Sequence, residues 1–366
     1  MEEVLIVNMS FSIPDKEGKV GYIPLGPLYI VSALKNAGYK VDFIDYLVDL
    51  LNNGSQKDRN KILSFFHADM NTAKMEVDYI FIDAQNIQRI IDHPAKYVGI
   101  GCTSGTLPQV ILAIEEIKTK APDKTIILGG IGPTGVANDL MDHFPFIDII
   151  VLGEGEETIV EVMDNINADL SGVNGIIYRQ NDQVVKTKPR ARIQNLDKIN
   201  YPAFELIDFN NYTVTSITAS RGCTFKCSFC DTTQYWGRKN YYRSVENVIN
   251  ELKILVNDYG LTEFEFVDDT FVINRKWVER FCKELKKANL NIKWNCNVRV
   301  GLMDEPLMKL MADSGCYLVF YGIESGSNRI LKRINKGFTR EEAIEAIKTS
   351  SKYFHVMPSF ICCLLY

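Results

Sequence analysis

Short apolar segments alternate with helical segments along most of this 366-residue chain. Strands that alternate with helices form parallel sheets, because each crossover helix packs against a face of the sheet. The alternation therefore predicts an α/β fold in both halves of the chain. In the N-terminal half, the expected strands are residues 4–8, 41–44, 97–101, 125–128 and 148–151.

The length of the chain suggests two domains. We expect a doubly wound, flavodoxin-like parallel sheet over residues 1–190, a linker over 191–213, and a partial barrel of strand–helix units over 214–366. Residues 50–96 are mostly polar with a helical pattern and are interpreted as an insertion, and residues 175–187 as a hairpin. In the C-terminal half, we expect strands at 263–267, 292–296, 317–322 and from 355, and helices at 244–257, 275–288, 305–314 and 339–352.

The composition argues against several classes of protein. The net charge is −5 and no long basic run occurs, so no nucleic-acid partner is expected. No signal peptide opens the chain and no apolar stretch reaches about 18 residues, so we expect no membrane segment. Nine cysteines are an odd number in a chain too long for a disulfide scaffold, which predicts reduced thiols and a cytoplasmic location.

Three cysteines lie close together in the second half, at Cys223, Cys227 and Cys230. Three thiolates on one loop can surround one metal centre, but they cannot all pair as disulfides. A [4Fe–4S] cluster usually takes four cysteines, so a cluster held by three leaves one iron open to a substrate. The alternative is a zinc loop whose fourth ligand comes from Cys282, Cys296 or a histidine.

The spacing of three and then two residues between these cysteines, after the apolar segment 214–220, resembles the cluster loop of the radical S-adenosylmethionine (SAM) superfamily. The resemblance implies a partial (βα)6 barrel and a [4Fe–4S] cluster whose open iron chelates SAM. It also implies an external electron donor, such as flavodoxin or ferredoxin. The electron cleaves SAM to methionine and a 5′-deoxyadenosyl radical.

Charged and polar residues follow the expected strands of this half. Carboxylates can accept hydrogen bonds from a ribose or an ammonium group, and an arginine can clamp a carboxylate, and SAM carries all three groups. A structural alternative for each residue is a helix cap or a surface ion pair. The resemblance implies that SAM contacts Arg299, Glu324, Ser325 and Asp268, with Phe229 against the adenine.

Loops rich in glycine and hydroxyl groups follow the expected strands of the first half. Parallel sheets bind ligands at the carboxyl ends of their strands, and glycines let a flat ligand approach the backbone closely. The simpler alternative is that the glycines only form turns. The candidate residues are Thr103, Ser104, Gly105, Gly129, Gly130, Pro133, Thr134, Gly153, Glu154, Gly155 and Glu156.

These loops, with the segment Ile23–Gly26, resemble the cobalamin-binding domain that precedes many radical SAM domains. The resemblance implies that the candidate loop residues hold cobalamin. Many cobalamin domains carry an Asp-x-His-x-x-Gly loop after the first strand, but residues 8–12 contain no histidine here. The radical SAM branch commonly lacks that histidine, so the lower cobalt face is expected to be open or to meet another group, with Cys102 as one alternative.

The chain ends at Tyr366 within an apolar segment, and the Gly-x-Pro-Gly-rich loop and sixth strand of the family do not follow. We therefore expect an incomplete barrel. The leading functional hypothesis is a cobalamin-dependent radical SAM enzyme that methylates an unactivated carbon, or another poor nucleophile, of a small molecule. The alternatives are a cyclisation, rearrangement or oxidation without methyl transfer, and a non-catalytic cofactor-binding module.

Overall fold

The computed structural model describes residues 2–10, 12–54, 59–60, 63 and 84–362. The chain divides into two compact units. Unit 1 comprises Met1–Ile193 and Ile199–Thr213, and unit 2 comprises Gln194–Lys198 and Val214–Tyr366. Much of the insertion predicted over residues 50–96 lies outside the described residues.

Unit 1 is built on a seven-stranded sheet with the order β3-β1-β4-β5-β6-β7-β8. Its strands are β1 (Glu3–Asn8), β3 (Lys40–Asp45), β4 (Tyr97–Gly101), β5 (Thr125–Gly129), β6 (Ile149–Val151), β7 (Ile176–Gln180) and β8 (Gln183–Lys186). Its helices are α1 (Leu25–Asn36), α2 (Tyr46–Asn53), α4 (Ala84–Ile91), α5 (Leu107–Lys120), α6 (Ile131–Thr134), α7 (Ala137–His143) and α8 (Glu156–Asn165). Short elements complete it: β2 (Val20–Tyr22), which pairs with β9 (Tyr212–Val214), and the 3-10 turns η2 (Phe204–Leu206) and η3 (Phe209–Asn211).

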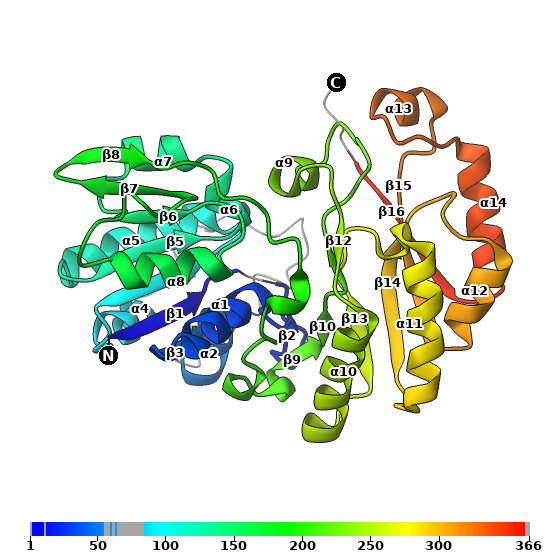
Figure 1. Cartoon of the computed structure of the whole chain (residues 1–366), viewed down its shortest axis with the longest axis horizontal. Helices are drawn as coiled ribbons and strands as arrows, with labels where there is room; N and C mark the ends of the chain where they lie inside the picture. The colour runs from blue at the N-terminus through cyan, green and yellow to red at the C-terminus, as the bar shows by residue number, and fades with distance from the viewer. Residues whose placement is uncertain (1, 11, 55–58, 61–62, 64–83, 363–366) are drawn as a thin grey trace. The chain divides into compact units, whose positions relative to one another are not determined.

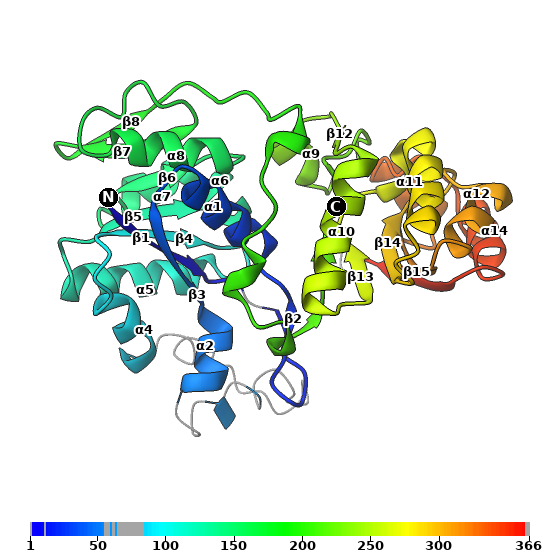
Figure 2. The same ribbon diagram turned by 60° about the horizontal axis from the view of Figure 1, so that its bottom comes forward.

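The sheet is doubly wound, as the sequence predicted. Strands β3, β1, β4, β5 and β6 are parallel, whereas the predicted hairpin, β7 and β8, extends the sheet in the antiparallel direction. Helices α1 and α8 cover one face, and α4 and α5 cover the other (Figure 2). Because both faces are covered, Val4–Val7 of the interior strand β1 are all buried.

Unit 2 contains a five-stranded, all-parallel sheet with the order β10-β13-β14-β15-β16. Its strands are β10 (Ser216–Ile217), β13 (Glu263–Phe266), β14 (Lys293–Val298), β15 (Cys316–Glu324) and β16 (His355–Phe360), with β11 (Ser220–Arg221) and β12 (Tyr241–Tyr242) forming a separate antiparallel pair. Its helices are α9 (Thr232–Trp236), α10 (Val245–Tyr259), α11 (Arg275–Ala288), α12 (Glu305–Ala312), α13 (Asn328–Arg333) and α14 (Arg340–Ser350), with the 3-10 turns η1 (Leu196–Lys198) and η4 (Phe271–Ile273).

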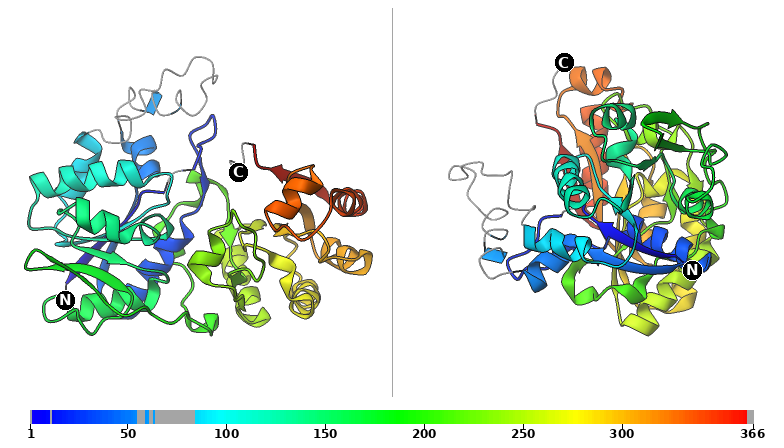
Figure 3. Two further views of the ribbon diagram at one scale, coloured as in Figure 1. Left: turned by 90° about the horizontal axis from the view of Figure 1, so that it is seen from above. Right: turned by 90° about the vertical axis from the view of Figure 1, so that its left-hand side faces the viewer.

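The strands of this sheet follow chain order, with helices between them, as expected for a partial barrel. The last strand, β16, lies at one edge of the sheet (Figure 3). The connecting helices have well-defined ends: Ser244 caps α10 by accepting from Asn247 N, and Thr339 and Glu342 form a capping box on α14.

An aromatic cluster forms the core between this sheet and α11. Four rings, those of Phe266, Phe271, Phe281 and Trp294, have all their centroids between 4.7 and 5.8 Å apart. Such a packed set of large side chains holds α11 and η4 against strands β13 and β14. No helix in the described part of the chain is long and apolar enough to cross a bilayer.

Candidate functional site

The cysteine loop follows β11 in unit 2. Cys223, Cys227 and Cys230 are half-buried, and none of them forms a disulfide. Three thiols on one loop supply three of the four cysteine ligands that a [4Fe–4S] cluster usually takes, so one iron would stay open to a ligand.

Asp268 fastens the backbone that leads into this loop. Its carboxylate accepts hydrogen bonds from Ala219 N at 3.0 Å and from Ser220 Oγ at 2.5 Å, and its side chain is fully buried. Burial raises the pKa of Asp268 to about 6, although the hydrogen bonds from Ser220 and the backbone oppose that shift. Both carboxylate oxygens are therefore engaged by the segment that precedes the cysteines.

Arg299 lies against the loop from the end of β14. Its Nη1 donates to Cys227 Sγ at 3.5 Å, and its guanidinium carbon lies 3.9 Å from the centroid of the Phe225 ring. The side chain of Phe338 faces the same guanidinium at 5.6 Å. The stacking fixes the plane of the guanidinium, and the sulfur contact uses one of its donors, so others remain for a ligand.

Glu324, at the end of β15, has an unusual backbone. Its φ is +68°, and every other described non-glycine residue with positive φ is Asn or Asp. A glutamate in this region is strained, and such strain collects at functional sites. Its Oε1 accepts from Lys336 Nζ at 2.8 Å, in a pair whose side chains are only 11% and 8% exposed. Its Oε2 has no partner among the described residues, so this oxygen can accept a further hydrogen bond.

Residues Ile334–Phe338 form a segment, here called the clamp, that sequence reasoning missed. Ile334 O accepts from Ser228 N at 3.0 Å, and Asn335 Nδ2 donates to Lys226 O at 2.9 Å. Lys336 binds Glu324 and lies 5.5 Å from the Phe229 ring, while Gly337 and Phe338 border Arg299. A Cβ on Gly337 would lie 3.3 Å from Arg299 Nη2, and its φ of +76° also favours glycine.

The structure thus gathers most of the predicted SAM residues at one place. Glu324, Arg299 and Phe229 all border the clamp, and Ser325 Oγ accepts from Ser327 N at 3.2 Å. Asp268 differs, because its carboxylate is occupied by backbone and Ser220. The sequence feature that could have indicated the clamp is Gly337, which follows a basic run. The sequence did not indicate which loop the clamp would contact.

In unit 1, the candidate loops meet at the carboxyl edge of the sheet. Gly132 N donates to Cys102 O at 3.2 Å, and Cys102 N donates to Gly129 O at 3.2 Å. A Cβ on Gly130 would lie 2.6 Å from Cys102 O, and one on Gly132 would lie 2.6 Å from the Thr103 carbonyl carbon. Only glycine allows the two loops to approach this closely. Thr103, Ser104, Gly105 and Gly130 are exposed on the resulting rim, whereas Pro133 is buried.

Thr134 connects the third loop to this pair. Its Oγ1 donates to Gly130 O at 2.8 Å and accepts from Gly153 N at 3.4 Å. The apolar side chains of Ile131 and Val136, 38% and 41% exposed, lie at the same edge and were not predicted from the sequence. The rim therefore offers hydroxyls, backbone amides and apolar surface to a flat ligand.

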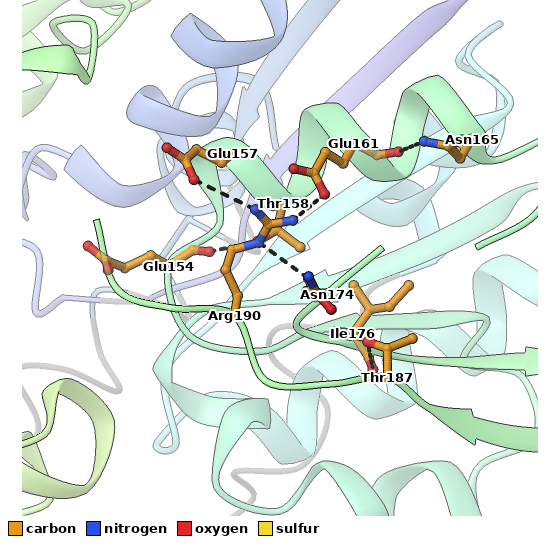
Figure 4. Close-up of polar contacts among 9 residues, drawn as sticks. All are labelled: Glu154, Glu157, Thr158, Glu161, Asn165, Asn174, Ile176, Thr187 and Arg190. Atoms are coloured by element: carbon orange, nitrogen blue, oxygen red, sulfur yellow. Dashed lines mark hydrogen bonds and ion pairs between the residues drawn. The ribbon is translucent and has the colours of Figure 1, made fainter. Parts of the chain in front are cut away.

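Glu154 is directed to the chain's own backbone rather than to this rim. It is buried, and its Oε2 accepts from Ile193 N at 2.8 Å. Nearby, Arg190 reaches across α8 to pair with Glu157 at 3.6 Å and with Glu161, as Figure 4 shows. These contacts fasten residues 190–193 to α8 and to the loop that precedes it. Gly155 has a packing role, since a Cβ there would lie 2.8 Å from Ile30 Cδ1, and Glu156 begins α8.

The first strand of unit 1 ends in a polar cluster in place of a histidine loop. Asn8 Nδ2 donates to Asp45 Oδ2 at 3.3 Å, and Tyr212 Oη donates to the same oxygen at 2.9 Å. Burial raises the pKa of Asp45 to about 6, against the opposing effect of these hydrogen bonds. Burial also raises the pKa of Cys102 to about 12, which disfavours the thiolate form that a metal ligand requires.

One other group of metal-ligand residues lies close together in the described part of the chain: Glu3, Asp42 and His93. His93 Nε2 lies 3.2 Å from Asp42, and His93 Nδ1 accepts from Ala95 N at 3.2 Å. Since Nδ1 is the acceptor, a neutral ring carries its proton on Nε2, which then has no lone pair for a metal. Glu3 is also paired with Lys40 at 2.8 Å. This group is therefore an ion-pair cluster.

Comparison with known proteins identifies the two units. Residues 217–366 match the radical SAM superfamily, and residues 19–163 match the B12 binding domain. The chain therefore belongs to the radical SAM superfamily, in the group whose members carry a B12-binding domain ahead of the radical SAM domain. The cofactors of these two domains are a [4Fe–4S] cluster with SAM, and cobalamin.

Several relatives are similar over most of the chain. An uncharacterised methyltransferase of Pyrococcus horikoshii is 35% identical, with 78% of this chain and 63% of that protein aligned. The cytidylyl-2-hydroxyethylphosphonate methyltransferase of Streptomyces wedmorensis is 29% identical, over 98% of this chain and 72% of that protein. The anaerobic magnesium-protoporphyrin IX monomethyl ester cyclase of Cereibacter sphaeroides is 30% identical, over 74% of this chain and 48% of that protein. The chain thus spans less than two thirds of the first and third relatives.

Solved structures show the same fold. OxsB, a cobalamin-dependent SAM radical enzyme solved with aqua-cobalamin, has a TM-score of 0.74 at 21% identity, over 99% of this chain and 49% of that one. The radical SAM methyltransferase TsrM of Kitasatospora setae was solved with cobalamin and a [4Fe–4S] cluster. It has a TM-score of 0.73 at 16% identity, over 98% of this chain and 67% of that one. The predicted fold class, a flavodoxin-like sheet followed by a partial radical SAM barrel, is confirmed.

Proposed function

We propose that this protein is a cytoplasmic, cobalamin-dependent radical SAM methyltransferase that acts on an unactivated carbon, or another poor nucleophile, of a small molecule. The observation that carries the proposal is the site of unit 2. There, three spaced thiols adjoin a stacked arginine and a strained glutamate with a free carboxylate oxygen. The B12-binding domain upstream and the methyltransferases among the relatives favour methyl transfer.

The bound cofactors would supply a carbon-centred radical from SAM and a methyl group carried by cobalt. The residues of this chain would hold and orient them. Cys223, Cys227 and Cys230 bind the cluster. Glu324 Oε2 would accept a hydrogen bond from a hydroxyl or the ammonium group of SAM, and Arg299 would clamp the SAM carboxylate, since both side chains keep unoccupied hydrogen-bonding capacity. The ring of Phe229 and the hydroxyl of Ser325 complete the SAM contacts.

We assign Asp268 a positioning role instead of a ligand role, because its carboxylate holds Ala219 and Ser220. For cobalamin, the rim of unit 1 provides the contacts: Thr103, Ser104, Gly105, Gly129, Gly130 and Thr134, with Gly153 and Glu156 beside them. Pro133, Glu154 and Gly155 shape the loops from beneath, because they are buried or packed against the chain.

Anaerobic reconstitution tests the proposal. Protein loaded with iron, sulfide and hydroxocobalamin is incubated with SAM and dithionite, and nucleoside products are quantified. We expect 5′-deoxyadenosine and S-adenosylhomocysteine from the wild type, and neither from Cys227→Ala. Cys362→Ala is the matched control, because Cys362 is exposed and outside the loop. A wild type that retains no cobalamin and forms no S-adenosylhomocysteine would overturn the methyltransferase proposal.

A second candidate is radical chemistry without methyl transfer, which the similarity to magnesium-protoporphyrin monomethyl ester cyclases favours. The two candidates differ in their products. The cyclisation or oxidation candidate predicts 5′-deoxyadenosine without S-adenosylhomocysteine. Absence of both products from cluster-loaded protein would instead favour a non-catalytic cofactor-binding module.

A further inference from the structure

The cysteine loop has an inner and an outer side. Exposure alternates along it: Thr224, Lys226 and Ser228 are exposed, whereas the residues between them are only partly so. The cysteines therefore lie close to the molecular surface on the outer side of the loop. Electron transfer from another protein requires close approach to the cluster, and this side of the loop offers it.

The outer side of the loop adjoins a basic stretch of the chain. Residues 328–340 contain five basic residues and no acidic residue, and residues 221–230 contain two basic residues and no acidic one. This bias is notable in a chain whose net charge is −5. The two stretches meet at Ser228 N and Ile334 O, 3.0 Å apart, and at Asn335 Nδ2 and Lys226 O, 2.9 Å apart.

Helix α13 presents its charges on its exposed side. Leu331 is buried, while Arg329, Lys332 and Arg333, three and four positions apart, are exposed and share one side of the helix. No ion pair within the described residues involves Lys226, Arg329 or Lys332. An acid that touches this helix, Glu341, is paired with Arg340 and bound by Asn328. Helices α9 and α13 lie at the same end of unit 2 (Figure 1).

We propose that Lys226, Arg329, Lys332 and Arg333, here called the basic face, form the docking surface for an acidic one-electron carrier protein that reduces the cluster. Opposite charges steer such partners together and align them, which raises the association rate more than the final affinity. In the encounter, one electron leaves the reduced carrier, which is oxidised, and enters the oxidised cluster, which is reduced. No proton or other group is transferred in this step.

This inference rests on the proposed function, because it requires a redox-active cluster. The test therefore compares two reductants of the same cluster. Dithionite is small and needs no protein surface, whereas reduced flavodoxin, an acidic carrier, is the protein probe. The rate of cluster reduction is followed by its visible absorbance in an anaerobic stopped flow, with 5′-deoxyadenosine as a second readout.

The test variant is Arg329→Glu/Lys332→Glu, which reverses two charges of the basic face without removing a side-chain contact described above. The control is Lys283→Glu/Lys286→Glu on α11, since both lysines are exposed and lie in the second half of that helix. This helix runs back from the carboxyl edge of the sheet, so they lie toward the opposite edge. Lys226→Glu provides a third, independent change on the loop itself.

We expect the test variant to lose at least about tenfold in reduction rate with flavodoxin at low salt, and to be unchanged with dithionite. The control should match the wild type with both reductants, and added salt should bring the wild-type rate with flavodoxin toward that of the variant. Equal flavodoxin rates for the wild type and both basic-face variants would overturn the proposal. So would weakened binding of a labelled RNA with no change in the flavodoxin rate, which would assign the basic face to nucleic acid.

The two proposals fail in different ways. If dithionite reduces the cluster but no 5′-deoxyadenosine forms, the enzymatic proposal fails, while the flavodoxin comparison still decides the docking surface. If 5′-deoxyadenosine forms with both reductants, and its rates are the same in the wild type and the basic-face variants, only the docking-surface proposal fails.

Discussion

The pair formed by Lys336 and Glu324 provides the sharpest test of the unit 2 site. Lys336→Met keeps much of the side-chain volume but removes the ammonium that lies 2.8 Å from Glu324 Oε1. The carboxylate then stays in a position where its side chain is only 11% exposed, without the cation that balances it.

The expected cost follows from this burial. Removing one partner of a buried pair costs about 3–5 kcal/mol, whereas a surface pair contributes about 0–1 kcal/mol. The partial exposure of Glu324 places the expectation near the lower value, at about 3 kcal/mol. With a urea m-value of about 3 kcal/mol/M, the unfolding midpoint should fall by roughly 1 M.

Tryptophan fluorescence reports the loss of folding stability specifically in unit 2. The chain has three tryptophans, Trp236, Trp277 and Trp294, and all of them belong to unit 2. Trp294 is fully buried in the aromatic cluster, so its emission reports unfolding of that core. Lys332→Gln is the matched control, because Lys332 is exposed and close by in sequence. It should shift stability by no more than about 0.5 kcal/mol.

A double variant separates charge from packing. Glu324→Gln/Lys336→Met leaves no buried charge, so it should recover at least about 1 kcal/mol relative to Lys336→Met alone. If Lys336→Met unfolds at the same urea concentration as Lys332→Gln, the pair is not a buried ion pair in solution, and the orientation assigned to Glu324 loses its support.

Three further predictions concern other parts of the molecule. In unit 1, the raised pKa of Asp45 means that the fold favours the protonated form, so this group's contribution to stability falls as pH rises from about 4 to about 6. The stability difference between wild type and Asp45→Asn should therefore move against the wild type by about 2 kcal/mol between pH 4 and 7 in calorimetry. A constant difference across that range would contradict it. Gly132→Ala, whose Cβ would meet the Thr103 backbone at 2.6 Å, should lower cobalamin retention on gel filtration, whereas Gly172→Ala, with open space around it and outside the rim, should not. Arg299→Gln removes a cation and a donor from Cys227 Sγ, so the cluster without SAM should be harder to reduce, by about tenfold in equilibrium constant, or 59 mV for one electron; an unchanged potential would refute the sulfur contact.

Much of the fold could be predicted because its elements are encoded locally. Apolar runs of four or five residues predicted β1, β4 and β5 to within one residue of their observed ends. Gly260 ends α10 with the left-handed φ of +71° that a helix C-terminus favours. The apolar segment 214–220 is only partly a strand of the barrel sheet. Only Ser216–Ile217 pair with β13, and Ser220–Arg221 turn away to pair with β12. The apolar composition of residues 214–220 did not reveal that change of partner.

The candidate site likewise has features that the sequence predicted and features that it could not predict. The cysteine spacing and the strand-end positions of Arg299 and Glu324 are local features, and the sequence predicted them. The orientation of a side chain depends on partners that are distant in sequence. Asp268 follows a strand as a ligand would, yet its carboxylate binds residues nearly fifty positions earlier. Glu154 lies in a predicted ligand loop, yet it binds the backbone of Ile193.

The sequence by itself therefore determined the class of the protein: a three-cysteine cluster loop on a strand–helix repeat, behind a glycine-edged α/β domain. Only the tertiary structure decided how the site is held together. The clamp meets the cysteine loop through Asn335 and Lys226, which are 109 residues apart, and it places a buried lysine on Glu324. Such contacts arise because folding brings the ends of separate strands to one edge of a sheet. The spacing of residues along the chain does not predict which loops will be in contact at that edge.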